Sequence, residues 1–118
     1  MADVLNPAVL ETLRQLTPPG EPDVLNEVLT IFLQEVPPRI ERLRTSWASG
    51  NIQEMQRAAH SLKGSAGNIG AQALHELCRQ IDDKGRSGDL SGLPGLIDTL
   101  TAEFGKVEGE IHRLMNRN

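Results

Sequence analysis

The spacing of the apolar residues is the feature that most constrains the fold of this chain. Apolar residues recur three and four positions apart along most of the sequence, which is the period of helices that bury one face. No run of alternating β-branched residues bounded by turn residues is present. The sequence therefore predicts an all-α protein.

Turn and cap residues divide this pattern into five helical segments. Asn6 and Pro7 are typical of a helix start, and Pro37-Pro38 lies inside an otherwise continuous period, where we expect one long kinked helix. Gly85-Arg86-Ser87-Gly88 is expected to end the fourth segment. The five segments are expected at about 7–16, 23–48, 52–69, 71–84, and from between Asp89 and Pro94 to near the C-terminus.

Long amphipathic helices joined by short connections favour one compact architecture. We expect an antiparallel four-helix bundle with the short N-terminal helix as a cap. A chain of 118 residues has the size of one ordinary domain. The prediction is a single domain over residues 1–118, with the bundle core at about residues 22–116.

Composition excludes several classes of protein. No stretch approaches the roughly 18 to 20 apolar residues that cross a bilayer, and the N-terminus does not resemble a secretory signal. A net charge of −4 and only three aromatic residues argue against nucleic-acid binding. Cys78 is the single cysteine, so no disulfide forms within the chain. We expect a cytoplasmic monomer without membrane insertion.

The third segment has two different faces. At about 100° per residue, His60 lies opposite the apolar side and is expected to point outward. The predicted core side holds Met55, Ala58, Ala59, Leu62, Ala66, Ile69 and Ala73. The side around His60 holds Gln53, Gln56, Arg57, Lys63, Gly64 and Gly67.

The residues on the side around His60, which we call the His60 strip, indicate that His60 reacts as a nucleophile. A glycine in a helix interior costs about 1 kcal/mol relative to alanine, so Gly64 and Gly67 need a reason to be there. Missing side chains would let another protein approach the imidazole. A neutral imidazole is a competent nucleophile, and Lys63, one turn further, is a suitable counter-charge for a phosphoryl group on it.

These residues resemble the histidine-containing phosphotransfer (HPt) domains of multistep two-component signalling. The resemblance is carried by His60-Ser61-Leu62-Lys63-Gly64-Ser65, by Gly67-Asn68-Ile69-Gly70-Ala71, by the Leu74–Cys78 pattern and by the turn at Gly85–Asp89. It implies a phosphorelay intermediate whose histidine accepts a phosphoryl group from one receiver-domain aspartate and passes it to another.

The resemblance also implies roles for single residues. His60 would be phosphorylated, Lys63 would hold the phosphoryl oxygens, and Gly64 would keep the approach open. The position that supports the ring in the family falls at Asp82, where glutamine is common, and this departure leaves the role of Asp82 open. Arg86 would either contact the partner or pair with Asp82. The candidate partner contacts are Arg57, Gly67, Asp82 and Arg86.

Further implications concern cofactors and partners. The family has no kinase activity and binds no nucleotide, and the sequence contains no phosphate-binding glycine loop. No cofactor of its own is expected, because the receiver domain would supply Mg²⁺. The expected partners are receiver domains of a hybrid sensor kinase or of a response regulator.

Three alternatives remain open at this point. One is a helical adaptor that binds a signalling partner through the same face without phosphorylation. Another is the histidine domain of a chemotaxis-type kinase, which is part of a longer chain. A metal-binding bundle built on His60, His75 and His112 is disfavoured because no two of them are three or four positions apart. Cys78 and Trp47 are expected to serve packing.

Overall fold

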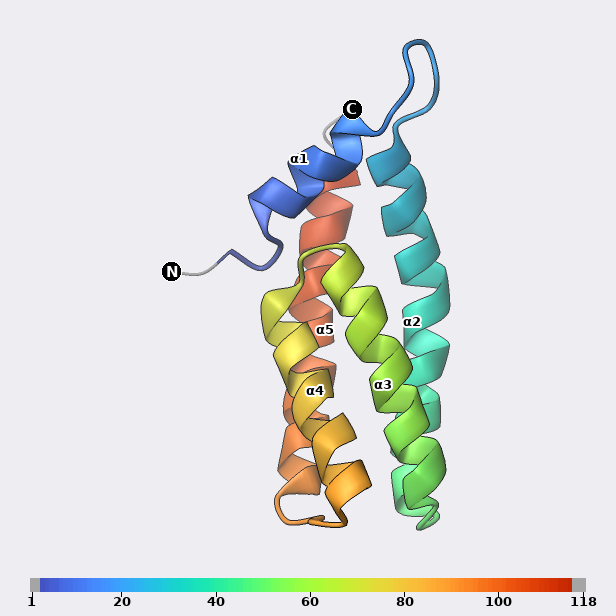
Figure 1. Ribbon diagram of the computed structural model, residues 1–118, viewed down its shortest axis with the longest axis vertical. Helices are drawn as coiled ribbons and strands as arrows, with labels where there is room; N and C mark the ends of the chain where they lie inside the picture. The colour runs from blue at the N-terminus through green and yellow to red at the C-terminus, as the bar shows by residue number, and fades with distance from the viewer. Residues whose placement is uncertain (1–2, 116–118) are drawn as a thin grey trace.

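The computed structural model of the protein describes residues 3–115, which form a helical bundle of 49 × 28 × 21 Å. Four long helices run antiparallel to their neighbours and a short fifth crosses one end (Figure 1). The helices are α1 (Pro7–Gln15), α2 (Val24–Ala48), α3 (Ile52–Asn68), α4 (Gln72–Ser87) and α5 (Leu93–Met115). Residues 3–115 contain no strand. The predicted all-α four-helix bundle with an N-terminal capping helix is confirmed.

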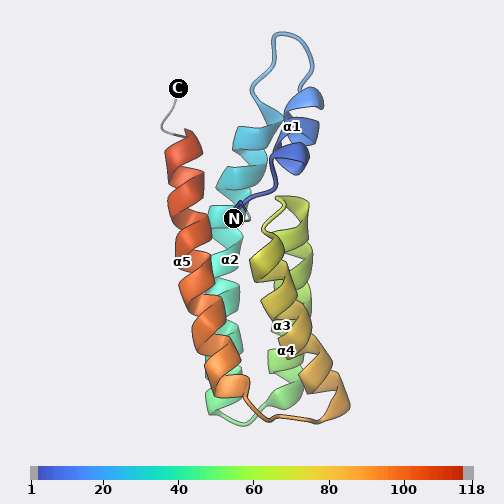
Figure 2. The same ribbon diagram turned by 90° about the vertical axis from the view of Figure 1, so that its left-hand side faces the viewer.

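Helix α1 is fixed to the end of the bundle at the turn between α3 and α4 (Figure 2). The side chain of Asn6 caps α1 by accepting a hydrogen bond from the Ala8 N–H at 2.9 Å, and Pro7 occupies the first turn. The Asn6 N–H donates to the carbonyl of Gly70 at 2.9 Å. Gly70 has a φ of +72°, and a Cβ there would lie 2.9 Å from Asn6 Cβ. Only glycine therefore fits this turn without displacing α1.

Helix α2 is continuous through its two internal prolines. Asp23 caps it by accepting from the Leu25 N–H at 3.0 Å, and the helix continues to Ala48. Each proline removes one N–H from the helical ladder, yet Val36 and Ile40 on either side are both buried. The prediction of one long helix is confirmed, while a kink at the prolines stays a prediction.

Two details of α3 and α4 differ from the sequence-based expectation. Gly85 does not end α4; the helix continues to Ser87 and ends at Gly88, whose φ is +81°. Ala73, expected on the core side of the third helix, lies exposed near the start of α4. The expected end of the fourth segment at Lys84 is wrong because a glycine inside a helix can also serve close packing against another helix. A Cβ on Gly85 would lie 2.7 Å from Gln56 Cβ, so its absence lets α4 approach α3.

The core runs the length of the bundle and is built from all four long helices. Cys78 is completely buried, and this burial raises the pKa of its thiol to about 12, consistent with a packing role. Trp47 is half-buried and packs against the core. The largest fully buried side chains are Leu29, Val36, Leu43, Met55, Leu62, Ile69, Leu74, Ile81, Leu93, Leu100, Val107 and Ile111.

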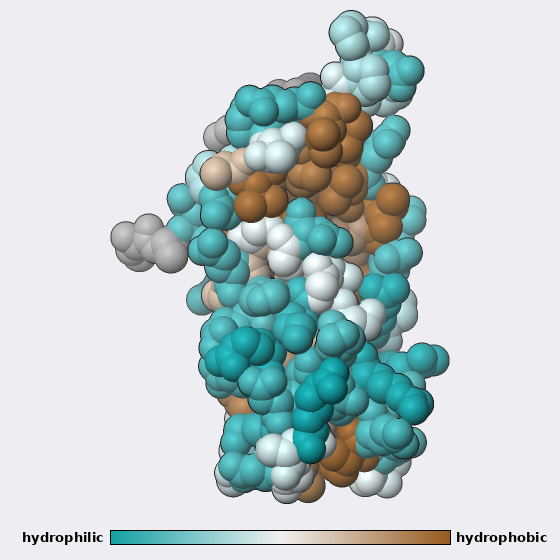
Figure 3. Space-filling model, viewed as in Figure 1, coloured by the Kyte–Doolittle hydropathy of each residue, from teal (hydrophilic) through white to brown (hydrophobic). Residues whose placement is uncertain are grey.

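The two ends of the bundle differ in surface character. Apolar surface gathers near α1 and the adjoining end of α2, where Leu16 and Ile31 are exposed, whereas the opposite half of the same face is mainly hydrophilic (Figure 3). Among residues 3–115, none of the helices combines the length and the apolar character needed to span a bilayer.

We expect Gly85→Ala to destabilise the protein by about 1–3 kcal/mol, because the new methyl group would overlap Gln56 across the α3–α4 contact. Gly64→Ala is the matched control, since a Cβ on Gly64 has no atom within 4 Å. This control should gain about 0.5–1 kcal/mol from helix propensity. Urea unfolding of both variants measures the difference. Equal stability of the two variants would contradict the close-packing role of Gly85.

Candidate functional site

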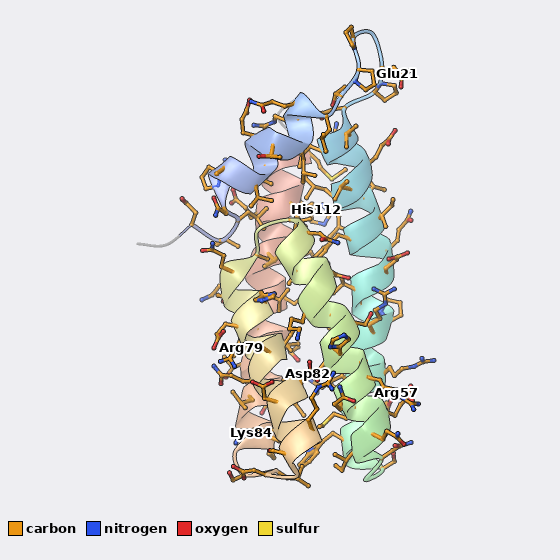
Figure 4. The ribbon with its side chains drawn as sticks, viewed as in Figure 1. Glu21, Arg57, Arg79, Asp82, Lys84 and His112 are labelled. Atoms are coloured by element: carbon orange, nitrogen blue, oxygen red, sulfur yellow. The ribbon has the colours of Figure 1, made fainter. Side chains whose placement is uncertain are left out.

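His60 projects from the middle of α3 on the side away from the core. Its side chain is 56% exposed, whereas Met55, Ala59 and Leu62 on the opposite side of α3 are buried. The outward orientation expected from the helical period is therefore confirmed. The side chains within hydrogen-bond distance of its ring, Asp82 and Arg86, come from α4, which packs beside α3 (Figure 4).

Asp82 lies beneath His60, in the contact between α3 and α4, and is only 1% exposed. Its Oδ2 lies 3.0 Å from His60 Nδ1 and accepts from Lys63 Nζ at 3.2 Å. Its Oδ1 accepts from Gln56 Nε2 at 2.6 Å and from Arg86 Nε at 2.9 Å. A carboxylate has about four lone-pair sites, and here each one has a partner.

This arrangement keeps Asp82 ionised. Burial by itself would raise the pKa of the carboxyl group, but the hydrogen bonds from Gln56, His60, Lys63 and Arg86 outweigh it. The pKa of Asp82 is therefore held well below its ordinary value. A buried carboxylate that has lost one of these partners would be left incompletely paired, which makes the four donors interdependent.

The ionised Asp82 determines which nitrogen of His60 is free. A carboxylate only accepts hydrogen bonds, so the Nδ1 that faces it at 3.0 Å carries the proton. Arg86 also lies near this nitrogen, with Nη2 at 3.4 Å, but a guanidinium donor cannot bond to a protonated Nδ1. The shorter contact with Asp82 decides the tautomer. In the neutral imidazole, Nε2 then holds the lone pair, on the edge of the ring that does not face Asp82.

Lys63 and Gly64, which follow His60 on its strip, differ in their exposure and in their contacts. Lys63 is partly covered, with 27% of its side chain exposed, and its ammonium group is bound to Asp82. Gly64 is exposed, and a Cβ there would meet nothing within 4 Å. The space beside His60 is open because Gly64 has no side chain, and Lys63 borders that space with a positive charge.

The remaining sequence candidates divide into buried and exposed residues. Asp82 is a candidate partner contact by sequence, but its burial corrects this interpretation, because the carboxylate supports the ring from below. Arg86 pairs with Asp82 while 58% of its side chain stays exposed. Arg57 is also exposed and lies 3.9 Å from Glu54. Both arginines are thus accessible beside His60.

Gly67 lies near His75 of α4 as well as near His60. A Cβ on Gly67 would lie 3.4 Å from Nδ1 of His75, which in turn donates to the carbonyl of Lys63 at 3.0 Å. The separation of 3.4 Å is an ordinary van der Waals distance, so an alanine would fit here, and the role of Gly67 in keeping the approach to His60 open stays a prediction. His75 joins the first turn of α4 to α3 directly behind the site.

Sequence reasoning missed the structural roles of Gln56, His75 and Gly85. Gln56 lies one turn before His60 on the same strip, and this spacing was the only sign that it joins the site. His75 and Gly85 carry no such signal, because their roles depend on how closely α4 approaches α3. Among residues 3–115, no group of three or more His, Cys, Asp or Glu side chains is arranged to hold a metal ion.

The fold and the site together define a helical bundle that presents one oriented, nucleophilic histidine on an open surface. Comparison of the sequence with known families matches the Hpt domain model over residues 27–115. This match covers most of the chain and all of its four-helix bundle apart from the first residues of α2. The chain belongs to the Hpt domain family.

Similar solved structures agree with this assignment. The chain superposes on histidine-containing phosphotransfer protein B from Pseudomonas aeruginosa PAO1 with a TM-score of 0.90 and 27% identity, covering 100% of this chain and 99% of that one. The HPT domain of a sensor hybrid histidine kinase from Shewanella has the same fold, with a TM-score of 0.80 at 21% identity and coverage of 98% and 96% of the two chains.

Curated relatives include short phosphotransfer proteins and a much longer sensor. Histidine-containing phosphotransfer protein 2 of Arabidopsis thaliana is 24% identical over 88% of this chain and 69% of its own length. The protein of the same name from rice is 31% identical over 63% of this chain and 54% of its own length. Sensor protein TorS of Escherichia coli is 26% identical over 75% of this chain, and the match spans only 9% of that sensor.

The lowered pKa of Asp82 predicts a pH dependence of stability. A carboxylate whose pKa is depressed in the folded state stabilises the protein above its ordinary pKa of 3.8, and this contribution is lost as the pH falls below that value. The free energy of unfolding should therefore fall between about pH 5 and about pH 2.5, and it should fall less in Asp82→Asn. Urea midpoints across this range give the slopes.

Asp98→Asn is the control for this measurement, because Asp98 is exposed on α5 and lies outside the Asp82 network. This variant should retain the slope of the native protein. A native slope in Asp82→Asn would show that Asp82 is not the group that responds.

Proposed function

We propose that the protein is a phosphorelay intermediate of two-component signalling that carries a phosphoryl group on Nε2 of His60. The phosphoryl group would come from the aspartate of one receiver domain and pass to the aspartate of another. The observation that carries the proposal is the contact between His60 Nδ1 and the buried carboxylate of Asp82, because it leaves Nε2 of the neutral ring unprotonated on a side chain that is 56% exposed. Membership in the Hpt domain family supports the same activity.

The first transfer forms one bond and breaks one. The Nε2 lone pair of His60 forms a bond to phosphorus as the bond to the aspartate oxygen of the receiver breaks, and the carboxylate leaves with the electron pair. No proton needs to leave, so Nδ1–H stays in place and the ring becomes positively charged. Asp82, 3.0 Å from Nδ1, stabilises that charge.

The second transfer reverses these steps on a different partner. A carboxylate oxygen of the second receiver attacks phosphorus, and the electron pair returns to Nε2. The positive charge on the ring makes the imidazole a good leaving group. The same contact with Asp82 thus orients His60 for both directions of transfer.

Lys63 and Gly64 complete the proposed site. The Lys63 ammonium borders the open space in front of His60, where it can move from Asp82 to the oxygens of a bound phosphoryl group. Gly64 leaves room for the receiver to bring its aspartate to Nε2. Mg²⁺, which we propose is bound by the carboxylates of the receiver, would neutralise phosphoryl oxygens during transfer.

The protein would then need neither a nucleotide nor kinase activity of its own. We further propose that it acts as a monomer in the cytoplasm, where Cys78 remains a free thiol. A helical adaptor that binds through the same face is the competing function, and it requires no covalent change at His60.

Incubation with a phosphorylated receiver domain should label the native protein on His60. The label should be lost by treatment with acid and retained in base, as expected for phosphohistidine, and it should be absent from His60→Gln. Phosphate-affinity electrophoresis and mass spectrometry give both readouts. Binding of the receiver without any label would favour the adaptor, and a label that persists in His60→Gln would rule out His60 as its site.

The open space at Gly64 makes a second prediction about transfer. A leucine in this position would stand beside His60 and block the receiver, so Gly64→Leu should slow phosphotransfer about tenfold or more while leaving the helical circular dichroism spectrum unchanged. Gly105→Leu is the matched control, because Gly105 also lies within a helix and a Cβ there would meet no atom within 4 Å. Native transfer rates in Gly64→Leu would contradict the steric role.

A further inference from the structure

A second feature of the His60 face is a hollow of about 280 Å³ between α2 and α3, which we call the basic groove. It directly borders the strip that carries His60, because Ser61 follows the histidine and Arg57 lies one turn before it. The residues that line the basic groove are Arg39, Arg42, Glu54, Arg57, Ala58 and Ser61.

The charges in the basic groove do not balance. Arg42 and Arg57 both approach the single carboxylate of Glu54, at 3.4 and 3.9 Å, and their side chains are 68% and 65% exposed. Arg39 lies 3.5 Å from Glu35. Three guanidinium groups therefore share two carboxylates, and the two most exposed arginines share one.

Arg39 is also fixed in position by α3. Its Nη1 donates to Ser65 Oγ at 3.1 Å, so the guanidinium spans the gap between the two helices. A cation held across the groove presents its charge with less loss of side-chain freedom on binding. Arg39 therefore forms the more rigid end of the groove, and Arg42 and Arg57 form the accessible end.

The groove contrasts with the charge of the whole chain. The formal net charge is −4, yet the strip and groove around His60 carry a local surplus of positive charge that includes Lys63 and Arg86. A large polyanion such as RNA or an anionic membrane would meet repulsion from the rest of the molecule. A small acidic patch on another protein would meet only the cationic face.

We propose that the basic groove docks the receiver domain by pairing with surface carboxylates around the phosphoacceptor pocket of that receiver, apart from those proposed to bind Mg²⁺. This inference rests on the proposed function, because the groove matters for transfer only if a receiver approaches His60. Charges that lie at the edge of an interface act mainly on the rate of association, and salt screens them. The groove thus increases productive encounters, whereas Asp82 and Lys63 act on the chemistry.

The test compares charge reversals that change the net charge equally. Arg42→Glu on α2 and Arg57→Glu on α3 alter the groove. Arg44→Glu alters α2 on the side that faces α5, where Arg44 donates to Thr101 at 3.1 Å. The probe is a purified receiver domain that labels His60 of the native protein, phosphorylated beforehand with acetyl phosphate. The readout is kcat/KM for phosphotransfer at low and high salt.

At low salt, each groove variant should lower kcat/KM about tenfold, and the double variant should lower it further and flatten its dependence on salt. Arg44→Glu should stay within about twofold of the native protein. Arg42→Gln and Arg57→Gln, which avoid placing a second carboxylate next to Glu54, should show the same direction with a smaller effect. Urea unfolding verifies that each variant is folded.

Three outcomes would overturn the inference. Equal effects of the groove variants and Arg44→Glu would show that only net charge matters. Unchanged transfer in folded groove variants, together with loss of binding to a labelled RNA or to vesicles containing phosphatidylserine, would assign the groove to a different partner. Loss of kcat without a change in salt dependence would place these arginines in the chemical step. Absence of any label on the native protein would instead reject the proposed function.

Discussion

The carboxylate of Asp82 is the interaction on which the site depends. It is buried between α3 and α4, and it binds Gln56, His60 and Lys63 from one helix and Arg86 from the other. A charge in this position is stable only while its hydrogen-bond partners remain. The close approach of α4 to α3, which Gly85 permits, is therefore also a requirement for the orientation of His60.

The same carboxylate connects structure to chemistry. By accepting a hydrogen bond from Nδ1–H, Asp82 holds the neutral His60 ring in the tautomer that leaves Nε2 unprotonated, and it lies where positive charge would develop in the proposed phosphoryl transfer. A neutral amide at this position could orient the ring through its oxygen but would stabilise the charge less. If His60 is phosphorylated as proposed, a carboxylate at the position where the family resemblance implies glutamine would stabilise the phosphoimidazolium more strongly.

Charge on the His60 face is arranged in two parts with different surroundings. Around Asp82, Lys63 and Arg86 are paired with a buried anion beside His60. In the basic groove, Arg42 and Arg57 are mostly exposed and share one carboxylate. The first arrangement suits stabilisation of a bound group, because the charges are held in place. The second suits attraction of a partner in solution, because the charges are accessible and incompletely neutralised.

Several parts of this protein follow from the sequence alone, because local rules determine them. The helical period predicted the bundle and the outward side of His60, and the cap at Asn6 marks a helix start through a contact within a few residues. The motif around His60 indicated the family. Gly85 was misinterpreted because its close neighbour, Gln56, belongs to the other helix of the pair. Only the tertiary structure could decide this contact, the burial of Asp82 and the position of the basic groove, since each depends on the distance and rotation between helices.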